Sequence, residues 1–394
     1  MNNENPFLTK IYDRGDFYFE DVLQSIHAAK KEIMFESYIF DYDPVGVPLL
    51  EALGKAHQRG VRVRLLVDAI GSFNWSMMIE QKCRQMNLPF RLYHPIPFQY
   101  QSLRRISWKN LRKLLFLFRR LNRRDHRKMI IIDKKICFLG SRNISQVHSE
   151  YYMGSSAWKD VSIRFDFSND SISPDIQACR VSFQRAWHQS RWNWHRLRRG
   201  PMSIFSRRFF LGYKSLKLIH THFHRRSRLF FQRQLHRWMK KATRRVYITN
   251  AYFIPKRSLL RTLVRASKRG VDVRVCLPEK TDVRLVQWAS RAVLYHLLRK
   301  GIKIYQYQKS VMHSKTMIID NLALIGSKNL NHRSLLHDLE IEAVLEDPSS
   351  VDKMLQIWKS DLQNSRILKL QHFENFSWIE KSFYKFIYWF RYWL

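Results

Sequence analysis

Apolar and polar residues follow one another along the chain in a pattern that predicts helices and strands in turn. Apolar residues at helical spacing in 17–31 predict a helix, and the dense β-type run at 32–40 predicts a strand after it. Residues 49–58 then predict a second helix and 61–68 a second strand. Helices that alternate with strands are typical of an α/β layered domain with a largely parallel sheet.

The second half of the chain repeats this series. It predicts a strand, a helix and a further strand at 246–253, 258–268 and 271–276. The repeat is plainest where RGVRVRLLV at 59–67 returns as RGVDVRVCL at 269–277. An internal repeat of this length determines the architecture more strongly than local propensities do.

We therefore predict two similar α/β halves, 1–200 and 201–394, with a break near the Gly200-Pro201 pair. Each half is expected to hold a mixed, mostly parallel sheet flanked by helices. The first half has the longer connection before its histidine motif, which includes a basic amphipathic stretch near 103–124. The second half ends in an aromatic and basic tail at 376–394.

Each half also carries one copy of a polar motif, H-x-K-x(4)-D followed by G-S-x-N. The first copy consists of His126, Lys128, Asp133, Gly140, Ser141 and Asn143, and the second of His313, Lys315, Asp320, Gly326, Ser327 and Asn329. Six residues separate Asp133 from Gly140, and five separate Asp320 from Gly326, so we expect a shorter turn in the second copy. Two full copies with matched tails predict a shared site.

The motif residues suit the chemistry of a phosphate ester. The apolar run after each lysine predicts a buried strand, and side chains at i and i+2 of a strand share a face, which places each lysine beside its histidine. The lysine can hold a phosphate oxygen while a ring nitrogen reaches the phosphorus. The serines and asparagines add hydrogen-bonding groups. Asp133 and Asp320 are expected to fix local geometry rather than to react.

Two such sets facing one another supply a nucleophile and a general acid, which allows transfer through a covalent phosphohistidine. The lysines would stabilise the developing negative charge, so no metal or other cofactor is expected. A transition metal at His220, His222 and His224 is disfavoured by a basic setting without Cys, Asp or Glu.

The net charge indicates a polyanionic partner. The 394 residues include 70 Lys and Arg against 32 Asp and Glu, for a formal charge of +38, and the 45% hydrophobic content is that of a folded protein. Nucleic acid and an anionic bilayer are the two candidates, and charge alone does not separate them.

The expected location is the cytosolic side of a membrane. The four cysteines are scattered and predict free thiols, and no signal peptide or apolar run of spanning length is apparent. The basic stretch at 103–124 and the tail at 376–394 match a bilayer interface, although each could instead be a helix packed on its own domain. We expect a peripheral membrane protein.

The doubled motif resembles the HKD signature of the phospholipase D superfamily. Three further stretches, FESYIFDYDPVG at 35–46, TNAYFIP at 249–255 and NHRSLLHDLE at 331–340, resemble its bacterial cardiolipin synthase branch, in the short form that lacks N-terminal transmembrane helices. The resemblance covers nearly the whole chain, and it implies a site at the interface of the halves.

The resemblance also implies a role for each site residue. His126 would be the nucleophile and His313 the general acid and then base, with the reverse assignment open because the repeat is nearly symmetric. The family's catalytic motif further contains the two lysines and the two motif aspartates. The phosphate would be held by four residues with two serines in support: Lys128, Lys315, Asn143 and Asn329, with Ser141 and Ser327. Asp160 would orient His313, and Glu340 would orient His126.

The predicted function is phosphatidyl transfer at the cytoplasmic face of a bacterial membrane, giving cardiolipin and glycerol from two phosphatidylglycerol molecules. The alternatives are phospholipid hydrolysis by water at the same intermediate, a metal-independent HKD nuclease, and a lipid-binding protein with a decayed site. The duplication within one chain disfavours the nuclease, so no nucleic-acid partner is expected. The intact His-Lys pairs disfavour the decayed site.

Overall fold

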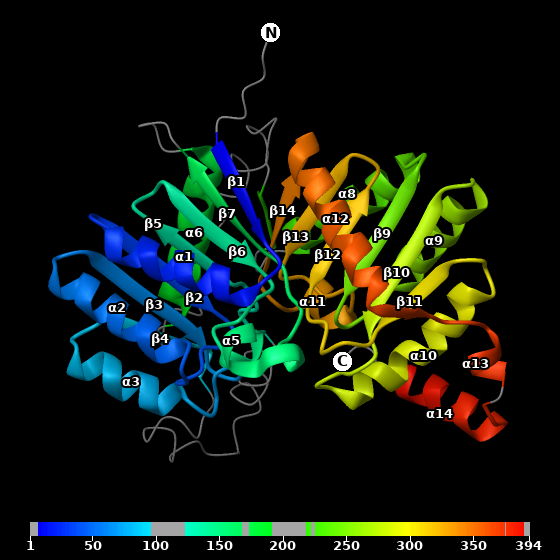
Figure 1. Ribbon diagram of the computed structural model, residues 1–394, viewed down its shortest axis with the longest axis horizontal. Coiled ribbons are helices and arrows are strands. Elements are labelled where there is room, and N and C mark those ends of the chain that lie inside the picture. Colours follow the sequence, from blue (N-terminus) through cyan, green and yellow to red (C-terminus); the bar gives the residue numbers. More distant parts are fainter. Residues whose placement is uncertain are drawn as a thin grey trace, which may run out of the picture.

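The chain forms two mixed sheets side by side, each flanked by helices (Figure 1). The computed structural model describes residues 7–95, 123–167, 173–190, 218–221, 225–374 and 376–389. Several features predicted from the sequence lie outside these residues: nearly all of the basic stretch at 103–124, the break at Gly200-Pro201, and His222 and His224.

The first sheet has seven strands in the order β1-β7-β6-β5-β2-β3-β4. Their bounds are β1 (Phe7–Tyr12), β2 (Glu32–Ser37), β3 (Arg62–Asp68), β4 (Phe90–Tyr93), β5 (Met129–Ile132), β6 (Ile136–Gly140) and β7 (Ser162–Phe167). The second sheet has eight strands in the order β8-β14-β13-β12-β9-β10-β11-β15. Their bounds are β8 (Leu218–Thr221), β9 (Arg245–Asn250), β10 (Asp272–Pro278), β11 (Lys303–Tyr307), β12 (Lys315–Ile319), β13 (Leu322–Gly326), β14 (Glu340–Leu345) and β15 (Ser365–Ile367).

The two strand orders are the same apart from the extra edge strand β15, so the sequence repeat is a repeat of the fold. The mixed character of the sheets is confirmed, but the prediction that they are mostly parallel is wrong. Only β2-β3-β4 and β9-β10-β11 pair in parallel among the described strands, and the other neighbours are antiparallel. The short turns after Ile132 and Ile319 account for one antiparallel pair in each sheet, β5-β6 and β12-β13, because a short turn can join only antiparallel strands and a parallel pair needs a long crossover.

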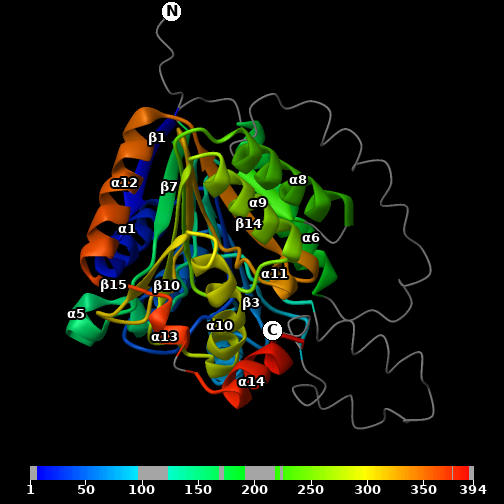
Figure 2. The same ribbon diagram turned by 90° about the vertical axis from the view of Figure 1, so that its right-hand side faces the viewer.

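The helices cover both faces of the two sheets. The longer ones are α1 (Gly15–Ala28), α2 (Gly46–Gln58), α3 (Ser76–Gln85), α6 (Pro174–Gln189), α8 (Arg225–Lys241), α9 (Arg257–Lys268), α10 (Arg284–Leu298), α12 (Pro348–Gln363) and α14 (Trp378–Trp389). The short ones are η3 (Gln146–His148), α5 (Glu150–Met153), η4 (Gly154–Ser156), α11 (His332–Leu336) and α13 (Gln371–Glu374). Figure 2 shows α1 and α12 on one side of the sheets and α6, α8 and α9 on the other.

A hydrophobic core joins the two halves. Its buried side chains come from both sheets, with Ile163 and Phe183 from the first half and Ile341 and Trp358 from the second. Helix α12 contacts β1, and the equivalent helix α6 contacts β8, so each half is covered partly by a helix of the other. Burial of this apolar surface fixes the halves against each other and so positions any site between them.

The aromatic C-terminal stretch is a helix as far as the structure describes it. Helix α14 packs along α10, with the Phe383 ring 5.6 Å from that of Trp288, while Trp378 remains 77% exposed. None of the helices in the described residues has the length and apolar character that crossing a bilayer requires.

Candidate active site

The two motif histidines meet between the halves because each is tied to the backbone of the opposite half. The His126 amide donates to the Leu339 carbonyl at 3.1 Å, and the His313 amide donates to the Lys159 carbonyl at 2.8 Å. These are short parallel bridges that cross from one half to the other. Each bridge places a histidine beside the residue that directly precedes a carboxylate of the other half.

Those carboxylates are Asp160 and Glu340. Nδ1 of His313 lies 2.8 Å from Asp160 Oδ2. Nδ1 of His126 lies 3.2 Å from Glu340 Oε2 and 3.0 Å from the Ser327 carbonyl oxygen. Acceptors at Nδ1 place the ring proton there and leave Nε2 of His126 with a lone pair. The structure therefore brings each histidine to a carboxylate contributed by the opposite half.

The serines of the two G-S-x-N tails hold these carboxylates. The Ser141 hydroxyl donates to Asp160 and the Ser327 hydroxyl donates to Glu340. The preceding glycines allow this, because a Cβ on Gly140 would lie 2.6 Å from the Ser162 backbone. The sequence predicted the serines as supports for the phosphate, whereas the structure places their hydroxyls behind the histidines, on the carboxylates that orient them. The shorter turn predicted in the second copy is present between β12 and β13, and it leaves this serine contact equivalent.

The two lysines are buried and differ in what they bind. Nζ of each lysine donates to the carbonyl of its own histidine, at 2.7 Å for Lys128, and Nζ of Lys315 in addition lies 2.9 Å from Nε2 of His313. Burial lowers the pKa of Lys128 to about 7, with repulsion from Lys315 contributing, and burial lowers the pKa of Lys315 to about 8. Two desolvated amines close together favour an anion between them, because its charge would stabilise both ammonium forms.

The asparagines of the two tails are buried at the same depth, each 2% exposed. Asn143 Oδ1 accepts a long hydrogen bond of 3.4 Å from the Ile39 amide. Asn329 Oδ1 is buried and has no hydrogen-bond partner among the described residues. A buried polar atom without a partner costs free energy, which a bound polar ligand would recover.

The motif aspartates lie at the other end of their strands from the histidines. Asp133 accepts hydrogen bonds from the backbone amides of Lys30, Lys31 and Glu32, at 2.7 to 2.9 Å. Asp320 accepts equivalent hydrogen bonds from the backbone amides of residues 243, 244 and 245, each at 2.9 Å. The interpretation that they fix local geometry fits this placement, whereas their inclusion in the catalytic set does not, because a strand separates them from the histidines.

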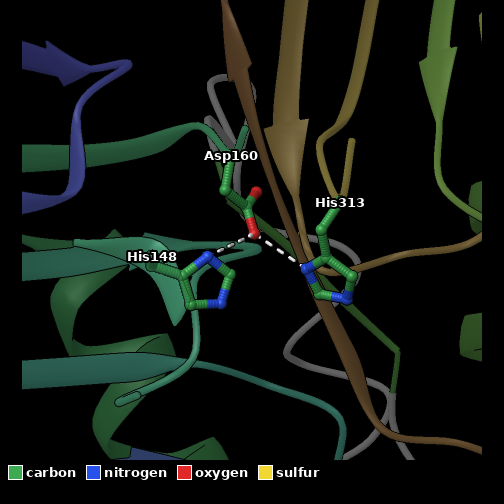
Figure 3. A group of neighbouring side chains, drawn as sticks. All are labelled: His148, Asp160 and His313. Atoms are coloured by element: carbon green, nitrogen blue, oxygen red, sulfur yellow. Dashed lines mark hydrogen bonds and ion pairs between the residues drawn. The ribbon is translucent and has the colours of Figure 1, made fainter. Parts of the chain in front are cut away.

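Sequence reasoning missed His148, which lies beside Asp160 (Figure 3). The backbone amide of Asn143 donates to Nε2 of His148 at 3.4 Å, and Nδ1 of His148 lies 3.8 Å from Asp160 Oδ2. Its side chain is fully buried next to His313, with the two ring centroids 5.8 Å apart. A lone histidine five residues after the motif asparagine carries no periodic signal, so only the fold reveals it.

Within the part of the chain that the structure describes, His148, Asp160 and His313 form the one group whose geometry could hold a metal ion, since their ligand atoms lie within 4.8 Å of one another. The surroundings disfavour a cation. The Lys315 ammonium contacts His313, and both this lysine and Lys128 make the site electropositive. The cluster suits the binding of an anion better.

The electrostatic environments of the two histidines differ. Burial, with repulsion from Lys128 and Lys315, lowers the pKa of His126 well below its usual range. Burial also lowers the pKa of His313, but the Asp160 carboxylate opposes that shift. Burial acts to raise the pKa of Asp160, yet His313 and Lys315 hold it well below its usual range, whereas burial raises the pKa of Glu340. His313 thus has the stronger anionic partner.

Aromatic rings from the ends of β2 and β9 complete the site. The Tyr38 ring lies 4.8 Å from that of His126, and the Tyr252 ring lies 6.4 Å from that of His313. The signal was present in the two stretches FESYIF and TNAYFI, each of which carries a tyrosine just after its strand, at positions of the repeat that differ by one residue.

The architecture and this site define a phospholipase D-like protein. The fold is similar to that of a phosphatidylserine synthase from Haemophilus influenzae, with a TM-score of 0.67 and 13% identity over 98% of this chain and 95% of that one. A polyphosphate kinase from Porphyromonas gingivalis is also similar, with a TM-score of 0.58 and 11% identity over 97% of this chain and 55% of that one.

The chain belongs to the family described as cardiolipin synthase, PLD-like domain, which matches residues 22–153 and 235–362. It is 28% identical to a cardiolipin synthase from Alkalihalophilus pseudofirmus over 93% of this chain and 68% of that protein. It is also 28% identical to one from Staphylococcus aureus over 96% of this chain and 73% of that protein. The resemblance inferred from the motifs is confirmed.

Proposed function

We propose that this protein is a phosphatidyltransferase that makes cardiolipin and glycerol from two phosphatidylglycerol molecules, through a covalent phosphatidyl-histidine. The family and its relatives support the transferase. The observation that carries the mechanism is the pair of buried histidines, each oriented by a carboxylate from the opposite half. A site with one histidine could only bind, whereas two can exchange a covalent bond and a proton.

In the first step, Nε2 of His126 attacks the phosphorus of one phosphatidylglycerol. The bond between phosphorus and the departing glycerol oxygen breaks, and His313 donates its Nε2 proton to that oxygen, with Lys315 moved from Nε2 onto the bound phosphate. Glycerol leaves, and the phosphatidyl group remains on His126. Its Nδ1 proton is shared with the Ser327 carbonyl and Glu340, which stabilises the positive ring of the intermediate.

In the second step, a glycerol hydroxyl of another phosphatidylglycerol attacks the phosphorus. His313 takes the hydroxyl proton, the bond between phosphorus and Nε2 breaks, and cardiolipin is released. His313 ends protonated and His126 neutral, as at the start. Water in place of the acceptor hydroxyl would give phosphatidic acid, which is the hydrolytic alternative at the same intermediate.

Two asymmetries support His126 as the nucleophile. Nε2 of His126 makes no hydrogen bond to the described residues, whereas Nε2 of His313 is bonded to Lys315 and is therefore less free to attack. In addition, burial lowers the pKa of both histidines, further for His126, while the Asp160 carboxylate opposes that shift at His313, so His313 is the easier of the two to protonate. A nucleophile must be neutral and an acid protonated.

The phosphate would lie between the two lysines and the two asparagines. Lys128 and Lys315 supply positive charge on the equatorial oxygens, in place of a metal ion or other cofactor. The orphaned Asn329 Oδ1 would accept from a hydroxyl of the glycerol group. Ser141 and Ser327 act on the phosphate only indirectly, through the carboxylates.

We further propose that the protein is peripheral and works at the cytoplasmic face of a bacterial cell membrane. Its substrates are membrane lipids, and its formal charge of +38 favours an anionic surface. Nucleic acid, the other polyanion that this charge allows, is not a proposed partner.

The test is to give the purified protein vesicles of phosphatidylglycerol and to identify the products by mass spectrometry. Cardiolipin and glycerol in equal amounts are expected, and phosphatidic acid alone would overturn the synthase assignment. His126→Ala should abolish turnover and leave vesicle binding unchanged. Metal-independent cleavage of DNA, with no activity on vesicles, would instead indicate a nuclease.

A further inference from the structure

Exposed apolar side chains are concentrated at one edge of the molecule. Of the fourteen large apolar side chains that are exposed in the described residues, nine lie in loops and helix starts at the end of the sheets where His126 and His313 meet, and four lie on α14. The remaining one, Ile367, is on the edge strand β15. Scattered exposed apolar residues are ordinary, but a concentration of them marks an interaction surface.

In the first half these side chains follow β3. That strand ends at Asp68, which binds Arg124 just before the first motif. Helix α3 then begins beside the site with Met77, which is 74% exposed, and Trp75, whose ring lies 6.4 Å from that of Tyr42. On the same edge, α5 follows His148 directly and leaves Tyr151 82% exposed.

The second half repeats this arrangement after β10. The Tyr252 hydroxyl, next to His313, donates to Asp282 at 2.5 Å, and α10 then begins with the exposed Val283 and Leu285. Exposed basic residues flank them at 280 and 284. The repeat therefore places an apolar helix start in each half, after the equivalent strands β3 and β10.

Helix α14 continues this edge past α10. Its inner face packs on α10 and places Tyr388 near Val286, at the start of that helix. Its outer face carries Trp378, Ile379 and Phe386, all exposed. In Figure 1, α3, α5, α10 and α14 all lie along the lower side of the molecule.

We propose that these four helix segments form a docking surface for an anionic bilayer, which we call the apolar rim: Trp75 and Met77, Tyr151, Val283 and Leu285, and the outer face of α14. The proposal rests on the proposed lipid function and adds the orientation of the protein on the bilayer. The rim would enter the headgroup region with its aromatic residues, while the positive charge holds the protein to the anionic surface. The active site would then open directly onto the lipid, so that a headgroup could enter without leaving the bilayer.

The native cysteines make a direct test possible, because all four are buried and a single introduced surface cysteine can be labelled selectively. Met77→Cys, Leu285→Cys and Phe386→Cys would each carry an environment-sensitive fluorophore, and Ile367→Cys is the matched exposed control. Vesicles of phosphatidylglycerol should shift the emission of the three rim labels to the blue and leave the control unchanged. An equal response at all four positions, or none at the rim while the protein sediments with vesicles, would overturn the orientation.

A second measurement separates docking from chemistry. The double variant Trp378→Ser with Phe386→Ser should weaken vesicle binding by about tenfold or more, since two apolar side chains no longer leave water. Its turnover of a soluble short-chain phosphatidylglycerol should equal that of the wild type, and Ile367→Ser should change neither quantity. If neither the wild type nor the variants form cardiolipin but the rim labels still respond to vesicles, the proposed function fails and the docking surface stands. Blue shifts that depend on protein concentration without vesicles would mean self-association and overturn the proposal.

Discussion

The two halves place the same residue types at equivalent positions and surround them differently. Burial acts on both carboxylates, but Asp160 in the first half faces His313 and His148 and its pKa is lowered, whereas the pKa of Glu340 in the second half is raised. Each lysine donates to the carbonyl of its own histidine, but Lys315 also contacts the outer nitrogen of that histidine, whereas Lys128 lies over the Tyr38 ring. A duplicated site can therefore divide one reaction into two roles while keeping one motif.

The largest expected effect comes from exchanging the histidines for alanine. His126→Ala should lose about 10⁴-fold or more in kcat with every substrate, because it removes the proposed nucleophile. His313→Ala should lose as much with phosphatidylglycerol, but it should retain the first step with a nitrophenyl phosphodiester, whose leaving group needs no acid. The burst of nitrophenol and the mass of the intact protein would reveal the covalent adduct. The opposite pattern would reverse the two roles.

The next largest effects are expected from the two carboxylates, Asp160 and Glu340, and these effects should differ in size. Asp160→Asn removes the strong anionic partner of His313, and we expect kcat to fall by about 10² to 10⁴-fold. Glu340→Gln should fall by only about tenfold, because the Ser327 carbonyl still accepts the His126 proton. Circular dichroism would verify that both variants fold. Equal losses would contradict the asymmetry of the site.

The pH dependence should depend on the lysines. Each lysine binds phosphate only while charged, that is, below its pKa, which is about 7 for Lys128 and about 8 for Lys315 in the free protein. We therefore expect kcat/KM for a soluble short-chain substrate to fall as pH rises through this range, by about 10²-fold or more between pH 7 and 9 if both charged lysines are needed. The effect on kcat should be smaller, because bound phosphate stabilises both charged forms. A kcat/KM that rose across this range would contradict the proposed phosphate site.

The motif aspartates should give the smallest effect on catalysis and should affect stability equally in both halves. Asp133→Asn and Asp320→Asn each remove one acceptor oxygen from a set of three backbone amides, at a cost of about 1–3 kcal/mol. Asparagine tolerates the positive φ angles of about 50° and 49° at these positions, so the turn itself is kept. Thermal denaturation would measure the loss, and kcat at a permissive temperature should remain near that of the wild type. A large loss of kcat in a fully folded variant would return these residues to the catalytic set.

Asp320 adds a pH dependence to stability. Although burial opposes it, the backbone amides of 243–245 lower the pKa of this carboxyl. Its contribution is therefore present above the ordinary pKa of an aspartate and is lost as pH falls through the lowered value. Asp320→Asn should remove that part of the acid sensitivity.

The fold was largely predictable because its signals are local. Apolar periodicity located the strands and helices, and the repeat predicted two equivalent halves. The strand directions were predicted wrongly because the helix-strand alternation suggested crossovers, while the turns after Ile132 and Ile319 allow none. The strands that flank those turns could be read from the sequence, but the pairing of a strand with its neighbours is not a local property.

The sequence by itself identified the candidate groups for the chemistry: two histidines and two lysines at spacings that repeat, to which the family resemblance added the carboxylates Asp160 and Glu340. Only the tertiary structure decided how they divide the work. It turned the serines onto the carboxylates, separated the motif aspartates from the histidines, and brought His148 to one half alone. The reason is physical, since residue identity fixes which protons and charges are available, whereas burial and distance across the interface set how strongly each is held.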